Sequence, residues 1–196
     1  MNKELDVNKR MFYFNTNDRY SVYDFSRTLY DMIEKHAQTN RPMVLLCIGS
    51  DRATGDSLGP IIGYKIEKLR HNNVSLYGTL EKPIHAKNLN ETIKNIHETH
   101  QNPFVIAIDA SLGRNTHIGY ITLGDGPLLP GAGVDKHLPA VGDISITGIV
   151  NNSCTLDHLL LQTTRLNVVM ALADFICSGI NYCFYKLKQV DLPASF

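Results

Sequence analysis

Apolar residues recur along the first half of the chain in two alternating patterns. In residues 21–36 they return every three or four positions, which predicts an amphipathic helix. The next apolar run, residues 43–48, is short, continuous and followed by Gly49. A run of this kind is typical of a strand buried on both faces of a parallel sheet. We therefore expect a helix that covers one face of a sheet, followed by a central strand.

The same alternation continues toward the middle of the chain. A helix is predicted over residues 57–69, with Ser57 or Asp56 as the N-cap. A strand over 74–77, a helix over 88–100 and a strand over 104–109 follow it. Strands that alternate with helices favour an α/β sandwich with right-handed crossovers.

The second half of the chain has a different composition. Residues 113–148 hold eight of the 14 glycines and three prolines. Strands are predicted over 118–123 and 143–150, on either side of a long glycine-rich loop that we interpret as functional. A final helix over 155–176 is expected to close the second face of the sheet.

The length of 196 residues and the hydrophobic content of 43% are sufficient for one domain with a sizeable core. We interpret residues 1–20 as an N-terminal arm, mobile at its polar tip, in which residues 11–14 form a short strand or a docked segment. Residues 21–196 are interpreted as a single domain.

The charge balance and the apolar segments limit the partners and the compartment. The 19 basic and 19 acidic residues cancel, which argues against a nucleic-acid or membrane partner. The four cysteines show no CxxC spacing, and we interpret them as reduced thiols. No signal-like segment opens the chain, and the apolar stretch 166–177, interrupted at Asp174, is too short to span a bilayer. A soluble cytoplasmic protein is expected.

The candidate chemistry lies at the carboxyl ends of the predicted strands. If the first three central strands are ordered 2-1-3, the crevice between the first and the third brings Asp56 and Asp109 to one site. A carboxylate at the end of an apolar strand must be solvated, paired or bound, because an isolated buried charge is costly. The alternative for Asp56 is an ordinary helix cap.

Two neighbouring carboxylates support acid/base hydrolysis of an amide, because each raises the pKa of the other and one can hold a proton while the other activates water. The same pair could bind a divalent metal, with His117 or His137 as a third ligand. A nucleotide site is disfavoured, because the loop 49–55 lacks P-loop and GxGxxG motifs. A cysteine nucleophile has little support: Cys47 lies in a buried strand, and Cys154 has only His158 nearby in sequence.

Three segments, GSDRATGDSLGP (49–60), AIDA (107–110) and PGAGV (130–134), resemble three motifs of the spore germination protease family in the same order. The resemblance covers residues 43–150. It implies a three-layer α/β/α sandwich of the phosphorylase/hydrolase-like kind, with a mostly parallel, mixed sheet that has one antiparallel strand. The hydrogenase maturation peptidases share this fold.

The resemblance also implies roles for the two acids. Asp56 and Asp109 match the proposed catalytic pair of that aspartic-type endopeptidase. In the hydrogenase peptidases, the matching acids bind nickel together with a histidine. Two departures are evident: Gly55 stands where the family has proline, and no histidine here clearly matches the nickel ligand.

Our hypothesis is a sporulation-associated endopeptidase of the forespore cytoplasm that acts on a protein or peptide substrate through Asp56 and Asp109. No cofactor is required by this hypothesis; a metal-dependent hydrolase and a noncatalytic peptide-binding protein are the alternatives. The oligomeric state is left open, with a homo-oligomer as one alternative. The residues expected to bind substrate are Gly49, Ser50, Asp51, Pro130, Gly131, Ala132 and Gly133.

Overall fold

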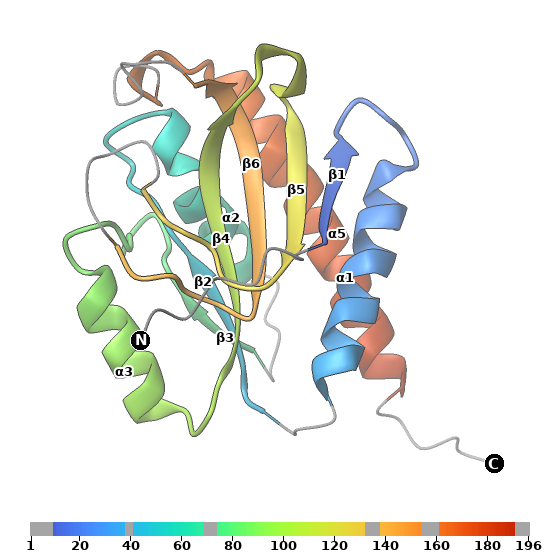
Figure 1. Cartoon of the computed structure of the whole chain (residues 1–196), viewed down its shortest axis with the longest axis vertical. Coiled ribbons are helices and arrows are strands. Elements are labelled where there is room, and N and C mark those ends of the chain that lie inside the picture. Colours follow the sequence, from blue (N-terminus) through green and yellow to red (C-terminus); the bar gives the residue numbers. More distant parts are fainter. Residues whose placement is uncertain (1–9, 38–40, 69–73, 132–137, 154–160, 191–196) are drawn as a thin grey trace, which may run out of the picture.

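The computed structural model describes residues 10–37, 41–68, 74–131, 138–153 and 161–190. Six strands form one sheet in the order β1-β5-β6-β4-β2-β3 (Figure 1). The strands are β1 (Met11–Asn15), β2 (Met43–Cys47), β3 (Val74–Tyr77), β4 (Phe104–Gly113), β5 (Tyr120–Asp125) and β6 (Ile144–Asn152). The helices are α1 (Ser21–Ala37), α2 (Leu58–Glu67), α3 (Leu89–Thr99) and α5 (Leu166–Val190), with short 3-10 helices η1 (Gly55–Ser57) and η2 (Asn115–His117).

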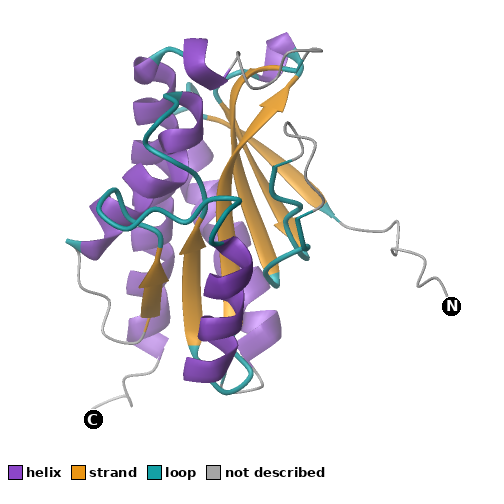
Figure 2. Cartoon of the chain, turned by 90° about the vertical axis from the view of Figure 1, so that its left-hand side faces the viewer, coloured by secondary structure: helices purple, strands orange, loops and turns teal. Residues whose placement is uncertain are grey.

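The strand pairing confirms the order predicted for the central strands. β2 pairs in parallel with both β3 and β4, and β4 pairs in parallel with β6. β5 is antiparallel to β6 on one side and to β1 on the other, so it runs against the other five strands. The mixed sheet with one antiparallel strand is therefore as the family resemblance implies, and Figure 2 shows its strands fanning out with a strong twist.

Two hydrophobic clusters, one on each face of the sheet, define the layers. Side chains of α1, α2 and α5 pack together with Leu45, Ile106 and Ile146 on one face. On the opposite face, Leu89 and Ile96 of α3 belong to a second cluster with Leu46 and Val105. Neighbouring positions of one strand thus point to opposite faces, as strand geometry requires. The result is the predicted three-layer α/β/α sandwich.

Helix α2 packs so closely against the ends of β2 and β3 that its backbone contacts theirs. A Cβ added to Gly59 would lie 2.0 Å from the carbonyl oxygen of Ile48, and one added to Gly63 would lie 1.8 Å from that of Gly78. Gly78 in turn leaves no room for a Cβ beside the carbonyl oxygen of Cys47. Glycines at these positions allow α2 to lie directly against the strand ends from which the candidate site is built.

Strand β4 is longer than the sequence predicts, so Asp109 lies inside the strand rather than at its end. We expected the strand to end at this residue, but it continues to Gly113 because pairing with β6 extends to Asn152. The neighbouring β2 ends at Cys47, which pairs with Ile108. Asp109 therefore lies within β4 but just beyond the end of β2.

The boundaries predicted for the last helix are wrong. The helix was expected over residues 155–176, of which 155–160 lie outside the described residues, but α5 begins at Leu166 and runs to Val190. Gly179 lies within this helix, and the Phe25 ring of α1 packs where a side chain would stand, with its Cδ1 2.3 Å from an added Cβ. Ile180 and Cys183, both fully buried, continue the apolar stripe beyond Gly179.

The apolar stretch that begins at Leu166 is therefore not too short to span a bilayer. Residues Leu166–Lys188 are long and apolar enough by length and composition, and 56% of the most apolar window is buried inside the protein. Leu172, Ile176 and Ile180 are completely buried in the main cluster. In this fold α5 is a core helix that lies beside α1 (Figure 1).

Candidate functional site

A pocket of about 250 Å³ lies at the carboxyl ends of β2 and β4. Helices α2 and α3, which connect successive strands, lie on opposite faces of the sheet, so the pocket occupies the switch point at which α/β proteins bind ligands. Four separate segments of the chain contribute to its wall. They supply Ile48, Gly49, Ser50, Arg52, Asp56, His85, Ala86, Lys87, Asp109, Pro130, Gly131 and Leu138.

The loop after β2 is folded back on itself by backbone contacts. Gly49 has a φ of +140°, and its N–H donates to the carbonyl oxygen of Ile84 at 2.7 Å. The Ser50 N–H donates to the backbone carbonyl oxygen of Asp56 at 3.1 Å. A Cβ at Gly49 would lie 2.0 Å from that same oxygen, so only glycine allows this closure. The closure holds Asp56 at the pocket.

Asp56 does not cap a helix. It is the central residue of η1, whereas Thr54 and Ser57 occupy the N-cap positions of η1 and α2, and neither makes a side-chain capping bond. The Ser57 hydroxyl instead donates to the carbonyl oxygen of Thr54 at 2.6 Å. The capping alternative for Asp56 is therefore wrong, and its carboxyl group lines the pocket.

Among the residues that the structure describes, Asp109 is the one buried acid, with 7% of its surface exposed. Its Oδ1 accepts a hydrogen bond of 2.8 Å from the Ala110 N–H. Burial raises the pKa of Asp109 well above its ordinary value, and the charge of Asp56 raises it further, against the lowering effect of that hydrogen bond. Asp109 therefore favours the protonated form.

Asp56 is more accessible than Asp109, and its surroundings include groups that raise its pKa and groups that lower it. Burial raises the pKa of Asp56, while a backbone hydrogen bond from Ser50 and the electrostatic influence of His85 lower it. The two acids thus differ in burial and share an electrostatic interaction. Pairs whose environments separate their pKa values are suited to acid/base chemistry.

The structure brings together most of the residues that the sequence assigned to the site. Gly49, Ser50, Pro130 and Gly131 line the pocket with the two acids. Asp51 is exposed in the loop and does not line it. The predicted positions Ala132 and Gly133 lie outside the described residues.

Two of the residues considered as alternatives, His117 and Cys47, lie away from the pocket. The His117 ring packs between Tyr13 and Tyr120, with ring centroids 5.6 and 5.3 Å away, and does not line the pocket. His137 and Cys154 lie outside the described residues. Among the residues that are described, no group of three metal-ligating side chains is found. Cys47 is fully buried in β2, as predicted.

Sequence reasoning missed His85, which lines the same pocket. We considered only the loops after the first and third central strands, but the segment after β3 returns to the same edge of the sheet. There Ile84 forms a parallel bridge with Ile48. The rule that parallel strands end at one edge would have drawn attention to the whole segment 78–88.

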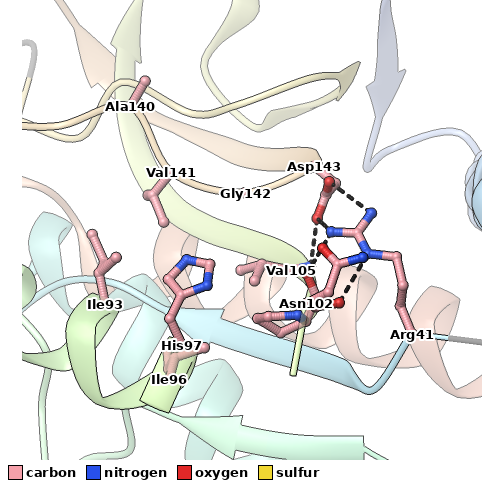
Figure 3. Close-up of a pocket in the computed structure, with 11 residues that line it drawn as sticks. Arg41, Ile93, Ile96, His97, Asn102, Val105, Ala140, Val141, Gly142 and Asp143 are labelled. Carbon is pink, nitrogen blue, oxygen red and sulfur yellow. Dashed lines mark hydrogen bonds and ion pairs between the residues drawn. The ribbon is translucent and has the colours of Figure 1, made fainter. Parts of the chain in front are cut away.

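A second pocket, of about 210 Å³, lies at the opposite end of the sheet, where the strands begin (Figure 3). There the Arg41 guanidinium faces Asp143 and donates to both carboxylate oxygens at 3.0 Å. Asp143 also accepts from the Val105 N–H at 2.8 Å. Because the charges of Arg41 and Asp143 satisfy each other, we interpret this end as a structural tie between strands.

Comparisons with known proteins identify a family and a relative, neither of which is described by an activity. A family model described as "Protein of unknown function (DUF1256)" matches residues 13–179. The "Uncharacterized protein YyaC" of Bacillus subtilis (strain 168) is 51% identical over 141 residues, which cover 72% of this chain and 69% of that protein. The crystal structure of a NiFe hydrogenase maturation protease from Thermococcus kodakarensis KOD1 is similar to 79% of this chain and 99% of its own, with a TM-score of 0.41 and 15% identity.

Proposed function

The chain belongs to the family described as "Protein of unknown function (DUF1256)", and we propose that it is a peptidase that hydrolyses peptide bonds with Asp56 and Asp109. One observation carries the proposal. Two carboxyl groups from separate elements line one pocket at the switch point of the sheet, and burial raises the pKa of both. Groups perturbed in this way within a cleft are favoured candidates for acid/base work.

The difference in burial assigns a role to each acid. Asp109 is almost fully buried and favours its protonated form, so it is the proton donor. Asp56 is more accessible and receives a hydrogen bond from the Ser50 backbone, which favours its ionised form, so it is the base. This assignment follows the pattern in which two carboxyls take different roles because their surroundings differ.

The reaction step then balances without a cofactor. Ionised Asp56 takes a proton from a water molecule whose oxygen attacks the carbonyl carbon of the peptide bond. The bond between carbon and nitrogen breaks, and Asp109 transfers its proton to the leaving amine. Proton exchange with solvent restores the starting states. The backbone N–H of Gly131, which lines the pocket, would help to stabilise the developing negative charge on the oxygen.

The motif resemblance to germination protease supports a role in sporulation. On that basis we propose that the substrate is a protein or peptide of the forespore cytoplasm. A divalent metal bound by the two acids is an alternative route to the same hydrolysis, and addition of chelator to the assay below distinguishes it. The noncatalytic alternative is a protein that holds a peptide in the same pocket.

The test is an unbiased cleavage assay. The wild-type protein is incubated with a forespore extract, and new peptide termini are identified by mass spectrometry. We expect termini that depend on the protein, and a loss of about a thousandfold or more in rate for Asp56→Asn and for Asp109→Asn, because catalytic groups that act as a unit fail together.

Asp51→Asn is the matched control, because it removes an exposed carboxylate from the same loop without changing the pocket wall. It is expected to cleave at the wild-type rate. Identical digests with and without wild-type protein, over pH 4 to 9 and with added divalent metals, would show that it is not a peptidase. Peptides retained by the wild type but not by the Asp56→Asn variant would then favour the binding protein.

A further inference from the structure

His85 extends the candidate site beyond its two acids, and the way it reaches the pocket is a feature of the fold. The short strand β3 ends at Tyr77, but the chain rejoins the sheet at Ile84, whose carbonyl oxygen accepts from the Gly49 N–H at 2.7 Å. The residue after Ile84 is thereby placed beside the loop after β2 that contains Ser50 and Asp56. His85 lines the pocket with both acids.

The backbone of His85 is fixed by a network of hydrogen bonds at the start of α3. Its N–H donates to Asn88 Oδ1 at 2.8 Å, and its carbonyl oxygen accepts from the N–H groups of Asn88 and Leu89, each at 3.0 Å. The Asn88 side chain also donates to the Pro83 carbonyl oxygen at 3.1 Å. A side chain on such a braced turn is held in one place relative to the pocket.

The imidazole ring is oriented by a further bond. Nδ1 accepts from the Lys87 N–H at 3.3 Å. In the neutral ring, an Nδ1 that accepts leaves the proton on Nε2. Nε2 has no hydrogen-bond partner among the residues that the structure describes. The half-buried ring therefore offers one N–H donor at the pocket.

We propose that the Nε2–H of His85 donates a hydrogen bond to the carbonyl oxygen of the scissile peptide bond. The proposal rests on the peptidase function proposed above and adds a third catalytic residue to it. His85 neither gains nor loses its proton: the bond strengthens as water attacks and negative charge develops on that oxygen. Donors positioned in this way stabilise the transition state more than the bound substrate.

The kinetic test uses the forespore peptide that the wild type cleaves fastest. We expect His85→Ala to lower kcat by about a hundredfold with KM changed less than about threefold, as for the loss of one oxyanion donor. His85→Gln, whose amide N–H can donate at a similar reach, is expected to recover at least about tenfold of that loss. His97→Ala, at the second pocket, is the matched histidine control and should be unchanged.

The outcomes separate this proposal from the one on which it rests. Cleavage that is lost in Asp56→Asn but kept in His85→Ala would overturn the role of His85 alone, as would equal losses in His85→Ala and His85→Gln. No cleavage by the wild type would overturn both proposals. A second measurement does not depend on activity: ¹⁵N spectra of histidine-labelled protein, assigned with His85→Gln, should show the Nε2–H tautomer. The Nδ1–H tautomer would contradict the proposal.

Discussion

At the scale of single residues, Asp109 combines a chemical role with a cost to stability. A carboxyl group whose pKa is raised by burial prefers to be protonated in the folded chain, whereas in the unfolded chain it ionises near its ordinary pKa of about 4. The folded state then binds more protons than the unfolded state at every pH between these two values. The free energy of unfolding must fall as pH rises through that window.

We predict that Asp109→Asn removes this dependence. Between the two pKa values of Asp109, the free energy of unfolding of the wild type should fall by about 1.4 kcal/mol for each pH unit. This contribution should be absent from the variant. At pH 7 the variant should be more stable than the wild type, because the wild-type carboxyl group ionises when the chain unfolds and so favours the unfolded state, whereas the amide does not ionise. Urea unfolding from pH 4.5 to 8 measures both effects. A variant less stable than the wild type at pH 7 would show that the carboxylate has a structural role.

At the scale of elements, the packing of α2 against the strand ends decides where the loop after β2 can lie. The contact is made by backbone atoms, so no side-chain rearrangement can relieve a change there. Of the two glycines in α2, Gly63, which lies against the Gly78 carbonyl oxygen, leaves the least room for a side chain. Its substitution measures how much the contact contributes.

Gly63→Ala sets two effects against each other. Helix propensity favours alanine by about 1 kcal/mol, but overpacking against fixed backbone costs about 1–3 kcal/mol or more. We expect a net loss in the free energy of unfolding, measured by urea denaturation. Gly113→Ala is the control, because its new Cβ would meet the flexible side chain of Ile149 at 3.0 Å and no backbone. A stable Gly63→Ala protein would contradict the close approach.

The elements also show what the sequence could predict. The types and approximate positions of the central strands followed from their apolar runs, because these strands are buried on both faces. The end of β4 did not, because it depends on pairing with β6, a tertiary contact. The extent of α5 was underestimated, because the residues that continue its buried stripe, Ile180 and Cys183, follow Gly179, whose place beside the Phe25 ring is a tertiary contact.

At the scale of the whole molecule, the candidate site was predictable where topology alone determines it. The order 2-1-3 placed Asp56 and Asp109 together, and the motif order added the loop at Pro130 and Gly131. The same rule on strand ends points to the segment 78–88 but does not single out His85 within it, because the single bridge between Ile48 and Ile84 leaves no strand pattern in the sequence. Topology can be inferred from periodicity, but isolated tertiary pairings cannot.

The packing of the core has a chemical consequence for the whole chain. Three cysteines, Cys47, Cys177 and Cys183, are free and buried in the main cluster. Burial raises the pKa of Cys177 and Cys183 to about 12 and that of Cys47 further. Since the thiolate is the reactive form, burial protects these thiols from modification in two ways: reagents cannot reach them, and they stay protonated.

The three thiols therefore act as built-in reporters of global opening. In a Cys154→Ser background, we expect iodoacetamide to modify them about a thousandfold or more slowly than in urea, because only unfolded molecules react. Mass spectrometry should find zero or three labels in each molecule when reclosing is slower than alkylation. Early labelling of Cys177 and Cys183 without Cys47 would instead reveal that α5 separates from the rest of the core while the sheet stays intact.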